Sequence, residues 1–174
     1  MIEWLFLDVD GTLTDGKIYI GNNGEIFKAF SVKDGCGLSD ILPKYNIKPV
    51  IITARESPIV TQRCKELKIE YVFQGCRKKK DKILDFCCEQ GLYLMENGKM
   101  PHIAYMGDDI LDLECIQIAQ VSGCPLDAVD EVKYVVDYVT KYKAGEGAVR
   151  DFIEFLVKGY KNITTKNNFD NYGL

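Results

Sequence analysis

Short apolar runs alternate with segments of helical periodicity along most of the chain. The runs predict buried strands, and apolar positions spaced three or four residues apart predict helices. The expected strands are Trp4–Leu7, Pro49–Ile52, Tyr71–Phe73, Ile103–Met106, Gln120–Ser122 and Tyr134–Val136. The expected helices are Leu38–Tyr45, Pro58–Leu67, Lys80–Gln90, Ile110–Ile118 and Ala148–Lys158. Such alternation predicts an α/β fold built on a doubly wound parallel sheet.

One segment departs from this alternation. The apolar stretches Lys17–Ile20 and Ile26–Phe30 flank Gly21-Asn22-Asn23-Gly24, a sequence that favours a β-hairpin. We therefore expect a hairpin flap over residues 16–31, directly after the first strand, and no cap domain. Residues 1–161 are expected to form a single domain. The polar residues 162–174 lack periodicity and predict a flexible tail, with ordering over a neighbouring site as the alternative.

Composition narrows the class of protein. Of the 174 residues, 47% are hydrophobic, but no apolar run approaches the roughly 18 residues of a membrane span. The net charge of −4 argues against a nucleic-acid partner. The chain starts with Met1-Ile2-Glu3, without a basic segment, so no signal peptide is expected. Seven cysteines without a Cys-x-x-Cys pair indicate reduced thiols, and thus a cytoplasmic protein.

The most informative motif is Asp8-Val9-Asp10-Gly11-Thr12-Leu13-Thr14-Asp15, directly after the first expected strand. Ligands of open α/β sheets bind at the carboxyl ends of strands, where Asp8 and Asp10 fall. Gly11 lets the backbone turn sharply and approach an anion. A calcium-binding loop starting at Asp8 would need a carboxylate at its twelfth position, and that residue is Tyr19. The motif therefore indicates carboxylate chemistry on a phosphate ester.

Histidine chemistry is not expected. The only histidine is His102, at the amino end of an expected strand, whereas Asp108 follows its carboxyl end. At about 3.3 Å per residue, the imidazole lies about 20 Å from the acidic site. This separation argues against Ser-His-Asp, Cys-His and phosphohistidine mechanisms.

Four motifs follow one another in the order seen in a known superfamily. The Asp8–Asp15 octet is followed by Thr53 after a strand, by Lys79 at a helix start, and by the acidic cluster Gly107-Asp108-Asp109-Ile110-Leu111-Asp112. Together they resemble the motifs of the haloacid dehalogenase superfamily of aspartyl phosphatases. The resemblance implies that Asp8 is the nucleophile and Asp10 the general acid and base. It also implies that Thr53 and Lys79 hold the transferring phosphoryl group.

The same resemblance implies a Mg²⁺ cofactor. Asp8 and Asp108 would bind the ion through their side chains, and Asp10 through its backbone carbonyl. Oxygen-only ligation suits this cation. Asp109 and Asp112 either orient metal-bound water or cap the helix that begins near Ile110.

Further matches resemble one branch of the superfamily, the capless phosphatases of 3-deoxy-octulosonate 8-phosphate. They are Phe30–Gly37, Thr53–Arg55, Phe73–Gly75 and Gly145–Arg150. This implies a small phosphorylated sugar acid as substrate, in a pathway to bacterial surface sugars such as lipopolysaccharide. We expect Arg55, whose guanidinium can grip a carboxylate, and Lys33 to bind it, with the Gly11 backbone close to the anion.

Alternatives remain at this stage. Related phosphatases act on nine-carbon keto-sugar acid 9-phosphates, including sialic-acid types. A non-catalytic oligomerisation module beside a sugar nucleotidyltransferase and a phosphate-accepting receiver domain are two further classes. Capless relatives tend to form tetramers, so a homotetramer is expected from the resemblance.

Overall fold

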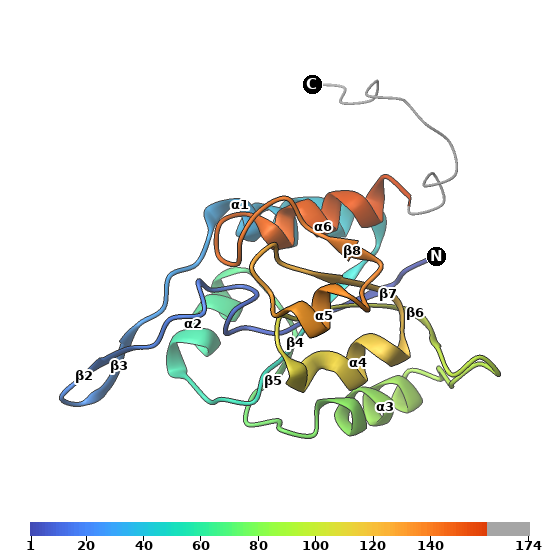
Figure 1. Ribbon diagram of the computed structural model, residues 1–174, viewed down its shortest axis with the longest axis horizontal. Coiled ribbons are helices and arrows are strands. Elements are labelled where there is room, and N and C mark those ends of the chain that lie inside the picture. Colours follow the sequence, from blue (N-terminus) through green and yellow to red (C-terminus); the bar gives the residue numbers. More distant parts are fainter. Residues whose placement is uncertain (160–174) are drawn as a thin grey trace.

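A six-stranded parallel sheet forms the centre of the molecule (Figure 1). The computed structural model describes residues 1–159. The strands are β1 (Trp4–Leu7), β4 (Lys48–Ile52), β5 (Tyr71–Phe73), β6 (Met100–Met106), β7 (Ala119–Cys124) and β8 (Tyr138–Val139). Their order is β5-β4-β1-β6-β7-β8, so the chain winds outward in both directions from β1. The predicted doubly wound parallel sheet is confirmed.

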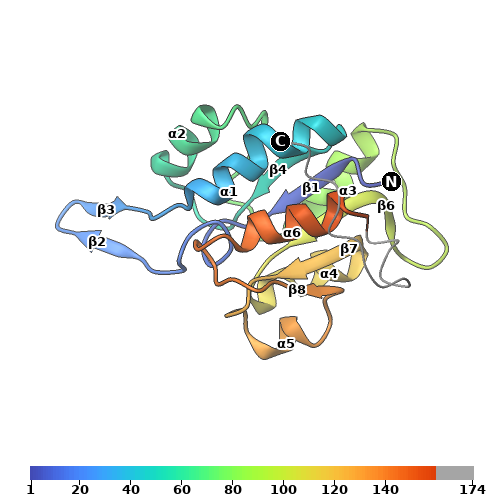
Figure 2. The ribbon, with the colours of Figure 1, turned by 90° about the horizontal axis from the view of Figure 1, so that it is seen from above.

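Helices cover both faces of this sheet. The figures place α1 and α6 over one face and α3 and α4 over the other (Figures 1 and 2). The α-helices are α1 (Val32–Cys36), α2 (Pro58–Glu66), α3 (Lys79–Glu89), α4 (Leu113–Ile118), α5 (Asp130–Lys133) and α6 (Ala148–Val157). A π-helical turn (Gly37–Ile41) and two 3₁₀ turns (Leu42–Tyr45 and Ile110–Asp112) complete the helical elements of residues 1–159. None of these helices is long and apolar enough to cross a membrane.

Strand β1 divides the core into two clusters. Side chains alternate between the faces of a strand. Leu5 and Leu7 therefore join the cluster beneath α1 and α6, while Trp4 and Phe6 join the cluster beneath α3 and α4. All four β1 residues are buried, which explains why the strand is a continuous apolar run.

The hairpin is confirmed, with shifted bounds. Strands β2 (Tyr19–Gly21) and β3 (Gly24–Phe27) pair antiparallel around Asn22 and Asn23, and extend from the body of the molecule (Figures 1 and 2). Lys17 and Phe30, which we assigned to the strands, lie outside them. Gly21 and Gly24 pair with each other, because the turn itself consists only of the two asparagines.

Two sequence predictions need correction. The helix predicted at Leu38–Tyr45 is the π-helical and 3₁₀ continuation of α1, because Pro43 has no N–H to extend an α-helical ladder. The strand predicted at Tyr134–Val136 is wrong. The chain turns there after α5, and sheet pairing starts at Tyr138. The Asp137 carboxylate accepts hydrogen bonds from the backbone N–H and hydroxyl of Ser122, which fixes this register.

Phe86 of α3 is the residue on which we expect the cluster beneath α3 and α4 to depend most. Its ring makes edge contacts with four aromatic rings, those of Trp4, Phe6, Tyr71 and Phe73. We predict that Phe86→Ala lowers the free energy of unfolding by about 3–5 kcal/mol, because a large buried cavity replaces the ring. Urea denaturation measures this, with the exposed Tyr93→Ala as control, expected within about 0.5 kcal/mol of wild type. Equal losses in both variants would contradict the prediction.

Candidate active site

Three strand ends bring the predicted site residues to one rim. Leu7, the last residue of β1, is in register with Ile51 of β4 and with Met106 of β6. Asp8 follows β1 directly, Thr53 follows β4 directly, and Asp108 comes two residues after β6. Because the strands are parallel, their carboxyl ends meet at the same edge, at the switch point of the sheet.

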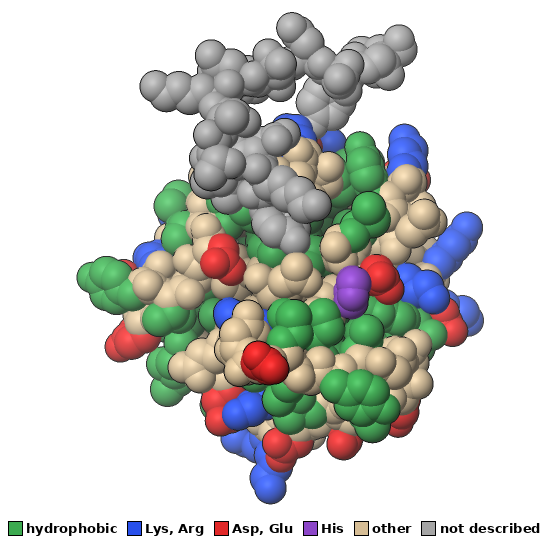
Figure 3. All heavy atoms as spheres, turned by 90° about the vertical axis from the view of Figure 1, so that its right-hand side faces the viewer, with side chains coloured by type: hydrophobic (Ala, Val, Ile, Leu, Met, Phe, Trp, Pro, Cys, Tyr) green, Lys and Arg blue, Asp and Glu red, His purple; other side chains and the backbone are tan. Residues whose placement is uncertain are grey.

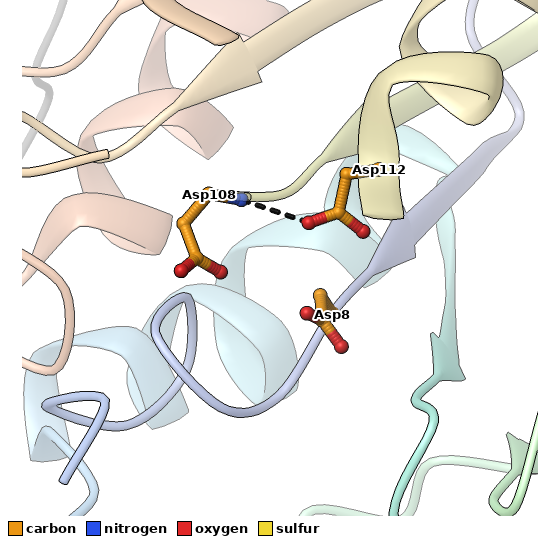
Figure 4. Close-up of side chains that lie close together, drawn as sticks. All are labelled: Asp8, Asp108 and Asp112. Carbon is orange, nitrogen blue, oxygen red and sulfur yellow. Dashed lines mark hydrogen bonds between the residues drawn. The ribbon is translucent and has the colours of Figure 1, made fainter. Parts of the chain in front are cut away.

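An acidic cluster forms at this edge. Asp8, Asp108 and Asp112 each offer a carboxylate oxygen, and these oxygens lie within 4.8 Å of one another. Figure 4 shows the three side chains converging from the end of β1, the end of β6 and the helical turn that follows β6. Of the three, Asp8 and Asp112 are buried and Asp108 is half-buried.

Asp112 connects the cluster to its surroundings through hydrogen bonds. One of its oxygens accepts hydrogen bonds from the Lys79 ammonium group at 2.7 Å and from the Tyr105 hydroxyl at 2.6 Å. The other accepts the backbone N–H groups of Asp108 at 3.0 Å and Asp109 at 3.2 Å (Figure 4). Both oxygens are thus engaged by two donors each. Asp109 in turn caps the helical turn through Ile110 N–H. The capping alternative describes Asp109 well, whereas Asp112 does more than cap.

Lys79 provides the positive charge of the cluster. It begins α3, is 3% exposed, and its Nζ lies 2.9 Å from the Asp8 carboxylate as well as 2.7 Å from Asp112. An ammonium group is buried only at considerable cost unless it is paired. Burial lowers the Lys79 pKa, but the two carboxylates outweigh it and the net shift is upward. Lys79 therefore stays charged beside Asp8.

The carboxylates retain an excess of negative charge. Burial, with repulsion from Asp112, raises the pKa of Asp8 to about 6 despite the contact with Lys79. Burial and repulsion from Asp8 and Asp112 raise the pKa of Asp108 to about 8. Both shifts show that the cluster binds a proton tightly, and it should bind another cation for the same reason.

Gly11 leaves room for Asp108. A Cβ at Gly11 would lie 2.0 Å from one Asp108 oxygen, and the backbone there has a φ of +86°, which favours glycine. The next residue, Thr12, donates its hydroxyl to Asp108 at 3.0 Å. The Gly11–Thr12 turn therefore fixes the Asp108 carboxylate against the start of the first motif.

The Asp10 side chain engages a different group of residues. Its carboxylate forms a short ion pair with Lys28, which follows β3 in the hairpin, and lies 3.7 Å from an Arg55 nitrogen. Glu25 of β3 accepts from Lys28 at 2.9 Å, from Arg55 at 3.1 Å and from the Ser57 hydroxyl. The structure thus brings Arg55, predicted to bind substrate, beside Asp10.

Lys33, which we predicted to bind substrate, and His102, which we predicted to lie away from the site, take no part in these contacts. Lys33 is exposed in α1, and its stem lies 3.6 Å from the position of a Cβ on Gly147. His102 contributes its Nδ1 to contacts at the opposite end of β6, 2.9 Å from the Met1 carbonyl oxygen and 3.3 Å from Glu3. The single histidine, purple in Figure 3, lies beside an acidic side chain on that face. This arrangement agrees with the structural role expected for His102.

Sequence reasoning missed Lys28, Glu25 and Tyr105. Tyr105 carried a usable signal, since a tyrosine in the middle of a buried apolar strand needs a partner for its hydroxyl. The charges of Glu25 and Lys28 lie in a hairpin expected near the site. However, their partners Arg55 and Asp10 are distant in sequence, so no local pattern pairs them.

The residues at the rim fit a magnesium ion. The donors are carboxylate oxygens, which Mg²⁺ prefers, and among the described residues the three carboxylates share the single ammonium group of Lys79. Asp112 already accepts two donors on each oxygen, so Asp8 and Asp108 are the side chains left to hold the ion. The Asp10 carboxylate is held by Lys28, in agreement with a role for Asp10 through its backbone carbonyl.

The raised pKa of Asp108 predicts a pH-dependent stability. Without metal, a carboxyl with a pKa of about 8 in the fold and 3.8 as its ordinary value binds its proton more tightly when folded. Its contribution to stability is thus complete below about pH 4 and is lost as the pH rises towards 8. In EDTA, wild type should lose more stability than Asp108→Asn between pH 5 and about 8.

Added Mg²⁺ should reverse this loss in wild type only. A saturating ion at about 100 times its Kd adds about 2.7 kcal/mol, and we expect a larger thermal shift at high pH, where fewer protons compete. Thermal denaturation of both proteins with and without Mg²⁺ measures the effect. The same shift in Asp108→Asn as in wild type would contradict the assignment of Asp108 as a ligand.

Comparison with known proteins places the chain in a family. No protein-family model matches it. It is 40% identical over 156 residues to the 3-deoxy-D-manno-octulosonate 8-phosphate phosphatase KdsC of Salmonella typhi, covering 90% of this chain and 79% of the relative.

Solved structures agree with the sequence match. The phosphatase of that name from Moraxella catarrhalis, in complex with magnesium, phosphate and KDO, superposes with a TM-score of 0.83 at 35% identity, covering 94% of this chain and 90% of that one. The cobalt-bound phosphatase of Haemophilus influenzae superposes with a TM-score of 0.83 at 31% identity, covering 98% of this chain and 94% of that one. The chain belongs to the 3-deoxy-D-manno-octulosonate 8-phosphate phosphatase family of the haloacid dehalogenase superfamily.

Proposed function

We propose that this protein is a Mg²⁺-dependent phosphomonoesterase that acts on 3-deoxy-D-manno-octulosonate 8-phosphate through an aspartyl-phosphate. The observation that carries this is the rim arrangement, in which the Asp8 carboxylate lies 2.9 Å from buried Lys79 and beside Asp108. A carboxylate held against a fixed cation is positioned to attack, because the incoming phosphate oxygens meet positive charge next to the nucleophile.

In the first step, an Asp8 oxygen attacks phosphorus and the ester P–O bond breaks. Asp10, which is two residues away and has one oxygen directed towards Arg55 rather than into the cluster, gives its proton to the departing alkoxide. Lys79 and Thr53 stabilise the oxygens of the transferring group. Bound Mg²⁺ would neutralise the repulsion between the phosphate and the carboxylates.

In the second step, water attacks phosphorus of the aspartyl-phosphate. Asp10, now ionised, accepts a proton from that water, and the Asp8 carboxylate is released with inorganic phosphate. Lys79 remains in place through its contact with Asp112, to which the Tyr105 hydroxyl also donates a hydrogen bond. The nucleophile therefore returns to the same position after each turnover.

The keto-sugar acid is supported by the relatives and by Arg55. The relatives with 40% and 35% identity carry the octulosonate phosphatase name. Arg55 is partly exposed at the rim, where its guanidinium can pair with the substrate carboxylate in place of Glu25. Lys33, exposed beside Gly147, is the second cation that we propose for the sugar acid.

The proposed substrate is tested by phosphate release with Mg²⁺ across a panel of sugar phosphates. We expect the highest kcat/KM for the eight-carbon acid 8-phosphate, at least about tenfold above hexose phosphates, because only the acid engages Arg55. Asp8→Asn is the control for contaminating phosphatase and should be inactive. A preference for nine-carbon acid 9-phosphates would show that the proposed substrate is wrong. No activity on any sugar phosphate of the panel would contradict the proposal that the protein is a phosphatase.

We also propose a cytoplasmic homotetramer. Four apolar side chains of the hairpin segment are exposed in the single chain: Ile18, Ile20, Ile26 and Phe27 are 51%, 70%, 61% and 49% exposed. Contact between subunits would bury them. Within residues 1–159 all seven cysteines are free thiols, in keeping with a reducing compartment. A monomer in sedimentation velocity at micromolar concentration would contradict the tetramer, and Ile20→Lys in the hairpin should weaken the assembly.

A further inference from the structure

Lys28 is buried, although it belongs to an exposed hairpin. Its side chain is 1% exposed, whereas four of its apolar neighbours in the same segment are about half exposed or more. Burying an ammonium group is unfavourable unless carboxylates compensate it. Lys28 has two such partners, Asp10 and Glu25.

The fold fixes where Lys28 lies. Lys28 follows β3, and an antiparallel bridge between Thr14 and Phe30 ties the base of the hairpin to the end of the first motif. On the other side, Glu25 accepts from Arg55 and Ser57, which follow β4. The hairpin therefore contacts both the first motif and the segment that follows β4, and Lys28 lies between these two segments.

The contact with Lys28 makes the two oxygens of Asp10 different. One oxygen is held by the Lys28 ammonium group. The other lies 3.7 Å from an Arg55 nitrogen, which is longer than a hydrogen bond, so no hydrogen bond to Arg55 holds it. Proton transfer needs one carboxylate oxygen directed at the leaving group. The residue that holds the other oxygen therefore determines the orientation of the carboxylate.

We propose that Lys28 is the positioning residue for Asp10, so that the hairpin orients the general acid rather than only covering the site. The inference rests on the proposed function, because it assumes that Asp10 protonates the leaving group. Lys28 acts through Asp10 and does not itself touch the reacting atoms.

Substrates with different leaving groups test this role. An alkoxide leaving group needs a proton, whereas p-nitrophenoxide departs without one, and kcat/KM reports only the steps up to its release. We expect Lys28→Met to lower kcat/KM by about 10- to 100-fold for 3-deoxy-D-manno-octulosonate 8-phosphate, and by less than about threefold for p-nitrophenyl phosphate. Asp10→Asn should show the same selectivity with a larger loss on the sugar phosphate.

The matched control is Lys17→Met, which removes an exposed lysine of the same hairpin segment and should leave both values near wild type. If Lys28→Met fails to fold, Lys28→Gln is the second variant. Its side chain is shorter than that of lysine and carries no charge, so it cannot replace the ion pair with Asp10, and the same selectivity is expected. Near-ultraviolet circular dichroism checks the fold of each variant.

The outcomes separate the inference from the function on which it rests. A wild type active on both esters, with Lys28 variants that lose activity equally on both or on neither, would overturn the role of Lys28 alone. A wild type that hydrolyses neither ester with Mg²⁺ would overturn the proposed function, and the inference with it.

Discussion

The repulsion among carboxylates at the end of β1 and β6 is the constraint on which the site depends. Asp8, Asp108 and Asp112 place oxygens within 4.8 Å of one another, and among the described residues one buried cation, Lys79, contacts this cluster. Asp112 accepts hydrogen bonds from Tyr105 and from two backbone N–H groups, so its negative charge is stabilised within the protein. Lys79 also pairs with Asp8, so Asp108 is the carboxylate of the cluster that contacts no cation among the described residues. This excess of negative charge gives the rim its affinity for a divalent cation and, through that cation, for a phosphate ester.

A second charged network surrounds the Asp10 side chain, apart from this cluster. Asp10 is only two residues from Asp8, yet its side chain pairs with Lys28, and Glu25 links Lys28 to Arg55. The proposed nucleophile and the proposed general acid therefore contact different cations. A hairpin between the first strand and α1 supplies the second network, in place of a cap domain. Its contacts reach both Asp10, the proposed general acid, and Arg55, the residue proposed to bind the sugar acid.

Much of this could be predicted from the sequence because it is local. Strand ends followed by Asp8, Thr53 and Asp108 locate the rim once the alternation of strands and helices indicates a parallel sheet. The contact of Lys28 with Asp10 depends on the hairpin angle, which no turn motif encodes. The position of β8 depends on the bond between Asp137 and Ser122, whereas the β-branched run at Val135 and Val136 suggested an earlier strand. Asp112 was expected either to orient metal-bound water or to cap a helix. Its contacts with Lys79 and Tyr105 emerge only when α3 and β6 pack together.

The central claim is that Asp8 carries the phosphoryl group during turnover. The most direct measurement mixes enzyme, Mg²⁺ and 3-deoxy-D-manno-octulosonate 8-phosphate, quenches with acid within the first turnover, and maps the modified peptide by mass spectrometry. With p-nitrophenyl phosphate, whose leaving group needs no proton, slowed breakdown in Asp10→Asn should increase the trapped amount, because Asp10 activates the water of the second step. The account predicts one phosphoryl group on Asp8, absent from Asp8→Asn. Product formation without any phosphorylated protein, in wild type and in Asp10→Asn alike, would contradict it.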